Sequence, residues 1–311
     1  MQGIVLQSTG SWYKVLLADR EELECRIKGK FRQDDIGSTN PVAVGDIVDV
    51  EHEEGLKTGI ITEILPRNNY IIRQSPRKKW QKHIIAANID QALLMVTFSE
   101  PRTSFGFIDR FLITAEMYEI PTVLLFNKFD TYTDKDLDLC AEAMETYVPL
   151  GYPCHTVSAV TGYGIDEVTL LMKDKKSLIA GHSGVGKSTL INAIAPHLDL
   201  STQEISSFSG KGMHTTTFAT MHKLPFGGFI IDTPGIKEFG VVHLEPNEVG
   251  HYYREMRELM TDCKFANCLH RNERNCAVKQ AFDNGEISET RYNSYLRILA
   301  DIESINYWER D

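Results

Sequence analysis

A glycine-rich stretch in the second half of the chain has the residue types that bind a nucleotide phosphate. Residues 181–188 read GHSGVGKS and match the phosphate loop G-x-x-x-x-G-K-[ST] at every fixed position. Glycines let backbone N–H groups converge on a phosphate, and the start of the following helix adds a favourable partial charge. We expect Lys187 to reach the β- and γ-phosphates and Ser188 to bind Mg²⁺. The expected contact set is Gly181, His182, Ser183, Gly184, Val185, Gly186, Lys187, Ser188 and Thr189, with His182 incidental because its position in the motif is variable.

A second motif distinguishes guanine from adenine. Asn127, Lys128 and Asp130 form N-K-x-D at the end of the apolar run TVLLF. The Asp130 carboxylate can accept hydrogen bonds from the guanine N1–H and 2-amino groups, which adenine does not offer in that arrangement. Asn127 can donate to the base edge, and the Lys128 stem can cover the ring. We expect Ser158 and Ala159, which follow another strand-like run, to present a backbone N–H to the guanine oxygen; an ordinary strand-to-helix turn is the alternative.

The magnesium side of the site is expected in the segment that follows the phosphate loop. Asp232 begins the sequence DTPG after the apolar run GFII. We expect Asp232 to hold Mg²⁺ through water and the Gly235 N–H to contact the γ-phosphate. The stretch GKGMHTTTF, between the two motifs, contains three threonines at 215–217. Of these, Thr216 is favoured to complete the Mg²⁺ shell.

The attacking water needs a group that positions it. Ile236 follows DTPG, so the glutamine that orients water in Ras-like GTPases is absent at that position. His214 stands just before the threonines and is the best candidate for water positioning, although a structural loop histidine is the alternative. Without the glutamine, we expect a slow isolated enzyme that needs a partner to order this segment.

The C-terminal region carries a set of metal ligands. Cys263, Cys268, His270 and Cys276 lie within one short stretch. Four nitrogen and sulfur ligands with no vacancy describe a closed tetrahedral zinc site, which is structural and not catalytic. The sequence therefore predicts one structural Zn²⁺.

The nucleotide motifs need a scaffold of alternating strands and helices. From Asp90 onward the chain alternates apolar strand-like runs with amphipathic helical stretches, which predicts a parallel sheet covered on both faces. The predicted helices begin near Phe107, at Lys135 and near Gly164, and in the stretch STLINAIA after the phosphate loop. In common GTPases the phosphate loop comes first, but here N-K-x-D precedes it. The domain is therefore predicted to be circularly permuted, which a fold tolerates when its original termini lie close together.

The segments before and after this scaffold have different sequence patterns. The first seventy residues contain short β-rich runs, the last of them NNYIIR, at about ten-residue spacing, which favours a five-stranded barrel of the oligonucleotide-binding (OB) type; a small β-domain without a ligand is the alternative. Residues 71–88 are predicted to be a basic linker. The C-terminal part is predicted to hold helices at 248–260 and 288–306.

The expected domains are 1–70, 71–240 and 241–311. The basic residues in and before the linker are candidate RNA contacts, and a solvated basic loop is the alternative. These candidates are Lys28, Lys30, Arg32, Arg77, Lys78, Lys79, Trp80 and Lys82.

The charge balance and the lengths of the apolar runs argue against two classes of protein. The 311 residues include 33 Lys and Arg against 43 Asp and Glu, a net charge of −10, which excludes a protein that coats nucleic acid through an overall basic field. No apolar run approaches the roughly 20 residues of a membrane helix. We expect a cytoplasmic monomer with no membrane association.

Taken together, these motifs resemble the circularly permuted ribosome small-subunit-dependent GTPase A family over essentially the whole chain. The resemblance implies an OB-fold barrel, a permuted P-loop GTPase domain and a zinc module. It implies GTP hydrolysis to GDP and phosphate during late maturation of the small (30S) ribosomal subunit, with that subunit and its rRNA as partners. His214 matches a histidine of the family motif. Two alternatives stay open: a GTP-switched RNA-binding module with incidental hydrolysis, and a GTPase with a tRNA or protein client.

Overall fold

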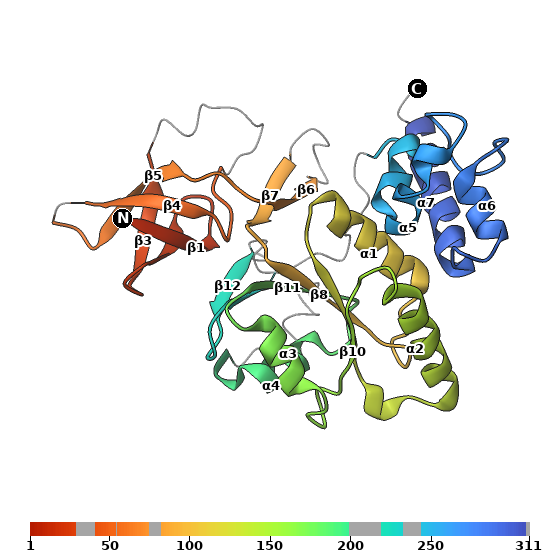
Figure 1. Ribbon diagram of the computed structural model, residues 1–311. Helices are drawn as coiled ribbons and strands as arrows, with labels where there is room; N and C mark the ends of the chain where they lie inside the picture. Colours follow the sequence, from red (N-terminus) through yellow and green to blue (C-terminus); the bar gives the residue numbers. More distant parts are fainter. Residues whose placement is uncertain (29–40, 54, 75–81, 199–218, 233–243, 309–311) are drawn as a thin grey trace.

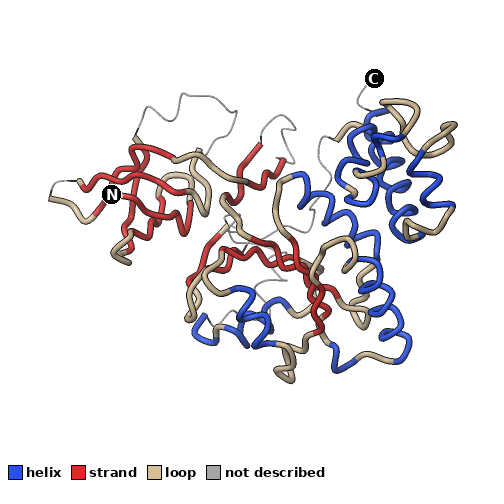
Figure 2. Tube along the Cα trace, in the orientation of Figure 1, coloured by secondary structure: helices blue, strands red, loops and turns tan. Residues whose placement is uncertain are grey.

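The computed structural model (Figure 1) describes residues 1–28, 41–53, 55–74, 82–198, 219–232 and 244–308. A β-barrel lies at one end, a sheet flanked by helices lies in the middle, and a helical unit lies at the other end (Figures 1 and 2). Among the described helices, none is long and apolar enough to cross a membrane.

The N-terminal part is a closed five-stranded barrel, as the β-rich runs predict. Its first strand pairs with both the second and the fourth, which closes the sheet on itself. Alternate residues of the strands point inward, where the side chains of Val5, Tyr13, Val15 and Ile61 are almost fully buried. The strands are β1 (Gln2–Ser8), β2 (Tyr13–Leu17), β3 (Glu22–Ile27), β4 (Ile47–His52) and β5 (Thr58–Ile64).

Two strands connect the barrel to the central sheet, where the basic run at 71–88 predicted a linker. Strand β6 (Tyr70–Gln74) pairs antiparallel with β7 (Lys82–Ala87) in a separate sheet. The run NNYIIR therefore belongs to this hairpin and not to the barrel. Polar contacts close the base of the hairpin: the Asn69 Oδ1 accepts a hydrogen bond from the Ile89 N–H at 2.7 Å, and its amide donates to the Ile89 carbonyl at 2.8 Å.

The central sheet has the predicted parallel core. Its spatial order is β10-β9-β8-β11-β13-β12, in which the first five strands are parallel and β12 is antiparallel to β13. Strands β8 and β9 are buried along their whole length, because helices cover both faces. The strands are β8 (Gln91–Val96), β9 (Thr122–Phe126), β10 (Cys154–Thr156), β11 (Lys176–Ala180), β12 (Thr220–Lys223) and β13 (Phe229–Asp232).

Successive residues of β8 divide the core between the two faces. Leu94 packs in a cluster with α1 (Phe105–Met117) and α2 (Asp134–Tyr147), whereas Leu93 packs in a cluster with α3 (Ile165–Met172) and α4 (Lys187–Ile194). Helix α1 is capped by the Ser104 side chain, which accepts from the Phe107 N–H at 3.2 Å, and α2 starts with a capping box. Short 3₁₀ turns follow β9 (Phe129–Thr131) and α4 (Pro196–Leu198).

The C-terminal part is a helical unit packed against α1. The single helix predicted for residues 248–260 is wrong, because this stretch forms the 3₁₀ helix η4 (Pro246–Tyr252), the short α5 (Arg254–Arg257) and the 3₁₀ turn η5 (Met260–Asp262). Gly250 lies within η4, where a Cβ would be only 3.1 Å from the Met260 sulfur and 3.3 Å from the His270 ring. Helix α6 (Ala277–Asp283) was not predicted, and α7 (Glu289–Trp308) confirms the predicted terminal helix.

Candidate functional site

The phosphate loop joins β11 to α4, as the motif predicts. Its three glycines have positive φ angles, +140° at Gly181, +83° at Gly184 and +98° at Gly186. A side chain is also excluded by contact, because a Cβ on Gly181 would lie 2.5 Å from the Met95 carbonyl. The Lys187 ammonium points back into the loop and donates to the Gly181 and His182 carbonyls at 2.8 and 2.7 Å. The loop therefore wraps around the ammonium of the lysine that the motif predicts to reach the phosphates.

Asn127 joins three predicted parts of the site. Its side-chain amide donates to the Val185 carbonyl at 2.7 Å, and its Oδ1 accepts from the Ala159 N–H at 3.2 Å. The residue is 1% exposed, so these bonds fix its orientation. A Cβ on Gly186 would lie 2.4 Å from the Asn127 Nδ2. The N-K-x-D motif, the phosphate loop and the turn at 158–159 are thus held together by one buried amide.

The remaining base-recognition residues surround this amide. The Ser158 hydroxyl donates to the Asp130 Oδ1 at 2.5 Å, while the Asp130 residue itself is exposed. Lys128 has the left-handed φ of +60°, and its ammonium donates to the Glu100 carbonyl at 2.6 Å. The Asp130 carboxylate is therefore oriented at the surface, beside Ala159. A carboxylate in this position can accept hydrogen bonds from two neighbouring N–H groups.

The magnesium side is described only in part. Ser188 is buried in the first turn of α4, directly behind Lys187. Asp232 ends β13, the neighbour of β11 in the sheet, and for this residue only the backbone is described. The predicted residues His214, Thr216 and Gly235 lie outside the described residues.

Four candidate zinc ligands converge in the C-terminal unit. Their ligand atoms all lie within 4.8 Å of one another. The Cys263 Sγ is 3.6 Å from the His270 Nδ1 and 3.9 Å from the Cys276 Sγ, and the latter two atoms are 3.4 Å apart. Bonds of about 2.3 Å to sulfur and about 2.0 Å to nitrogen in a tetrahedron give ligand separations of about 3.5–3.8 Å. The cluster therefore fits one Zn²⁺ bound through the His270 Nδ1.

The loop carrying His270 is held by groups that no sequence motif indicated. The Glu273 carboxylate accepts from the backbone N–H groups of residues 269, 271 and 272 at 2.7, 2.8 and 3.0 Å. Partial burial opposes ionisation of Glu273, but these N–H groups lower its pKa below the ordinary value. The Tyr292 and Tyr295 hydroxyls donate to the carbonyls of His270 and Leu269 at 2.6 and 2.9 Å. The ligand loop is thus fixed by α7 as well as by the ligands.

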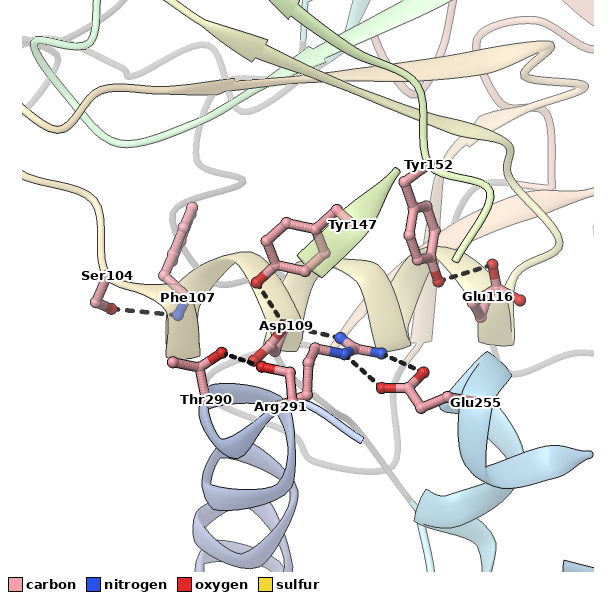
Figure 3. A network of polar contacts seen from close by, with 10 residues as sticks. Ser104, Phe107, Asp109, Glu116, Tyr147, Tyr152, Glu255, Thr290 and Arg291 are labelled. Atoms are coloured by element: carbon pink, nitrogen blue, oxygen red, sulfur yellow. Dashed lines mark hydrogen bonds and ion pairs between the residues drawn. The ribbon is translucent and has the colours of Figure 1, made fainter. Parts of the chain in front are cut away.

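A buried ion network joins this unit to the sheet domain (Figure 3). Arg291 of α7 donates through Nη1 to the Asp109 Oδ1 on α1 at 2.7 Å. It also forms a fork with Glu255 of α5, with bonds of 2.7 and 3.0 Å. The Tyr147 hydroxyl donates to the Asp109 Oδ1 at 2.7 Å. Sequence reasoning missed this network because its partners are far apart in the chain and no local pattern connects them.

The candidate RNA contacts are mostly outside the described residues. Lys28 is exposed just after β3, and nearby the Arg26 guanidinium lies 4.1 Å from the centre of the Trp12 ring. Lys30, Arg32 and the run Arg77, Lys78, Lys79 and Trp80 are not described, and Lys82 is described only as the first backbone position of β7. An RNA surface around these residues stays a prediction.

Comparisons with known proteins match these features. The family model described as RsgA GTPase matches residues 64–242, and the one described as RsgA N-terminal domain matches residues 2–61. A protein of Bacteroides fragilis named small ribosomal subunit biogenesis GTPase RsgA is 50% identical over 308 residues, 99% of each chain. A protein of the same name from Christiangramia forsetii is 54% identical over 309 residues, 99% of this chain and 98% of the relative.

Two solved structures share the fold of this chain. The crystal structure of YjeQ from Thermotoga maritima superposes with a TM-score of 0.80 at 36% identity, covering 96% of this chain and 97% of that one. The structure of YloQ, described as a circularly permuted GTPase, gives a TM-score of 0.77 at 30% identity, covering 97% and 95%. In the present sheet, β9 with N-K-x-D precedes β11 with the phosphate loop in the chain, while β8 separates them in space. The chain therefore belongs to the RsgA GTPase family and is a GTP-hydrolysing enzyme with a circularly permuted GTPase domain.

Proposed function

We propose that this GTPase assists the maturation of the small (30S) ribosomal subunit and binds that subunit through its rRNA. The names of the curated relatives support the subunit as the partner. The flanking barrel and the Cys/His unit supply two further surfaces for a large partner. We also propose that the chain divides at about residues 70 and 240, works as a monomer, and acts in the cytoplasm, where bacterial subunits assemble.

The observation that supports the nucleotide assignment best is the bridge made by Asn127. It connects the loop that suits a phosphate to the two elements that suit a guanine base. In this proposal the Asp130 carboxylate accepts from the guanine N1–H and 2-amino groups, and the Ala159 N–H is shared between the Asn127 Oδ1 and the guanine oxygen. Lys187 and the backbone N–H groups of residues 181–189 bind the β- and γ-phosphates.

The magnesium and water assignments extend the same proposal. Ser188, Thr216 and, through water, Asp232 hold Mg²⁺, which stabilises negative charge on the transferring phosphoryl group. The Gly235 N–H contacts the γ-phosphate. His214 positions the attacking water by hydrogen bonding in place of the glutamine that Ras-like enzymes use. One Zn²⁺, held by Cys263, Cys268, His270 and Cys276, stabilises the C-terminal unit.

A change of nucleotide base tests the site. Asp130→Asn should weaken GTP binding and shift the preference toward xanthosine triphosphate, because the amide can donate to the 2-oxygen of xanthine but cannot accept both guanine N–H groups. Asp134→Asn, an exposed carboxylate at the start of α2, is the matched control and should keep the guanine preference. Competition binding with the two nucleotides measures the shift, and an unchanged preference in Asp130→Asn removes that residue from base recognition.

A second measurement tests the partner. Purified small subunits should raise the GTP turnover of the full chain, and a non-hydrolysable GTP analogue should retain the chain on them in sedimentation. Retention without stimulation indicates an RNA-binding module with incidental hydrolysis. Loss of both effects indicates a different client.

A further inference from the structure

The histidine of the phosphate loop has a specific partner. The His182 ring stacks on the Phe107 ring of α1 with a centroid distance of 3.7 Å and an interplanar angle of 30°. Burial, together with the Lys187 charge, lowers the pKa of His182 below its ordinary value. The imidazole is therefore neutral at neutral pH, which suits close stacking on an apolar ring. His182 occupies a variable position of the motif, yet its ring anchors the phosphate loop to α1.

Helix α1 also contacts the C-terminal unit, through Asp109, which is two residues after Phe107. Residues 107 and 109 point about 200° apart on a helix of 3.6 residues per turn. Phe107 extends from α1 on the side away from α7, and Asp109 meets Arg291 on the side of α7 (Figure 3). The same helix also forms an ion pair between Arg110 and Asp301 of α7. One helix therefore touches the phosphate loop with one face and the Cys/His unit with the other.

The apolar residues of α1 also pack into two different cores. Ile108 and Phe111 belong to the core of the central sheet, whereas Ile113 belongs to the core of the C-terminal unit. A regular helix that is packed on both sides moves as one body, so a displacement on one face is felt on the other. Within the described part of the chain, the Phe107 and His182 rings join this helix to the phosphate loop.

We propose that Phe107 and His182 are positioning residues for GTP binding, and that through α1 they link the phosphate loop to the C-terminal Cys/His unit. This inference rests on the proposed binding of the nucleotide phosphates by residues 181–189. The stack holds the loop in the conformation that accepts phosphate. Nucleotide binding then stabilises α1 and, through α1, the packing of α7. Because the coupling is reciprocal, packing of α7 in turn favours nucleotide binding.

The affinity of the full chain for a fluorescent GDP analogue measures the positioning role. Phe107→Leu and His182→Ala should each weaken binding about two- to tenfold, the range that corresponds to about 0.5–1.5 kcal/mol for an aromatic pair. The double variant should be no weaker than the worse single variant, because both remove one contact. His182→Phe, which can stack on Phe107, should restore the affinity to within about twofold of the unchanged chain.

Phe105→Leu is the matched control for loss of a ring from the same helix. Phe105 stacks on Tyr147 of α2 at 6.3 Å and lies near Phe98, so its removal disturbs the core without removing the His182 contact. It should keep GDP affinity within about twofold. Steady-state turnover gives a further check: the stack variants should raise KM for GTP and leave kcat largely unchanged, because the contact acts on binding.

Hydrogen exchange of the backbone amides measures the linkage. Saturating GDP should slow exchange in residues 289–302 of α7 in the unchanged chain, and this protection should be lost in Phe107→Leu even when GDP is raised to saturate that variant. Equal protection of α7 in both chains would overturn the linkage. Unchanged GDP affinity in both stack variants would overturn the positioning role. If the unchanged chain itself does not bind GDP, the proposed function fails instead.

Discussion

Replacement of Arg291 by methionine should be the most damaging single change at the junction between the C-terminal unit and the sheet domain. Arg291 is 1% exposed and Asp109 is fully buried, and their closest atoms are 2.7 Å apart. Methionine keeps much of the volume of arginine but cannot donate to either carboxylate. The Asp109 charge would then remain buried without its cation.

The expected size follows from this burial. Removing one partner of a buried ion pair costs about 3–5 kcal/mol, because the remaining charge has neither water nor a counterion. The neighbouring pair of Arg110 and Asp301 also joins α1 to α7, but its side chains are 38% and 55% exposed. Arg110→Met should therefore cost less than about 1 kcal/mol. The two variants differ mainly in burial, which makes the second a matched control for the first.

The pH dependence has a definite sign. Burial raises the pKa of Asp109 above its ordinary value, and the Arg291 charge opposes this shift. Without Arg291 the pKa rises further, so the folded chain binds a proton that the unfolded chain releases. Stability of Arg291→Met should then increase as pH falls from neutral toward the unfolded pKa of about 4, since the folded state binds more protons in that window.

Urea unfolding followed by the near-ultraviolet signal of the tyrosines in the C-terminal unit measures these differences. The deficit of Arg291→Met relative to the unchanged chain should be larger at pH 7.5 than at pH 5.5. The double variant with Asp109→Asn should recover part of the loss, because the amide carries no charge and can still accept from the Tyr147 hydroxyl. If Arg291→Met unfolds no more easily than Arg110→Met at pH 7.5, the assignment of a buried charge pair is wrong.

Two further changes test the nucleotide loop and the metal cluster. Gly186→Ala should abolish guanine nucleotide binding by calorimetry while the chain stays folded, because its Cβ would lie 2.4 Å from the Asn127 Nδ2 at a φ of +98°; Gly285→Ala, at a φ of +79° with open space around it, is the control and should bind normally. Elemental analysis should find about one zinc per chain, as a closed site with four ligands requires, and chelation should speed hydrogen exchange in residues 263–276 while that of the barrel is unchanged.

The sheet domain could be predicted from sequence because its information is local. Each motif stands directly after a short apolar strand, as N-K-x-D does after β9 and the phosphate loop does after β11. A parallel sheet brings the carboxyl ends of its strands to one edge, so strand order and motif order together predict the site. The Asn127 bridge confirms that the two motifs meet, although they are far apart in the chain.

The C-terminal unit was predicted less well because its contacts are not local. The pattern of residues 248–260 predicts one helix, but the stretch forms 3₁₀ turns around a short helix, with Gly250 lying against His270 and Met260, which are not its sequence neighbours. Arg291 looks like an ordinary polar position of an amphipathic helix, and only the fold shows that it is 1% exposed. His182 was treated as incidental for the same reason, since nothing in the phosphate motif indicates that Phe107 will stack on it.

The two flanking units hold different parts of the nucleotide site. The barrel joins the sheet where Gln7 of β1 pairs with Thr220 of β12, and in the chain β12 directly follows the threonine-rich segment whose Thr216 is proposed to hold Mg²⁺. The C-terminal unit instead packs on α1, whose Phe107 supports the phosphate loop. A partner that binds both units at once would therefore constrain both sides of the phosphate site together, whereas a partner of only one unit would act on one side. This geometry favours a large partner surface, such as the proposed ribosomal subunit, over a small client bound at one end.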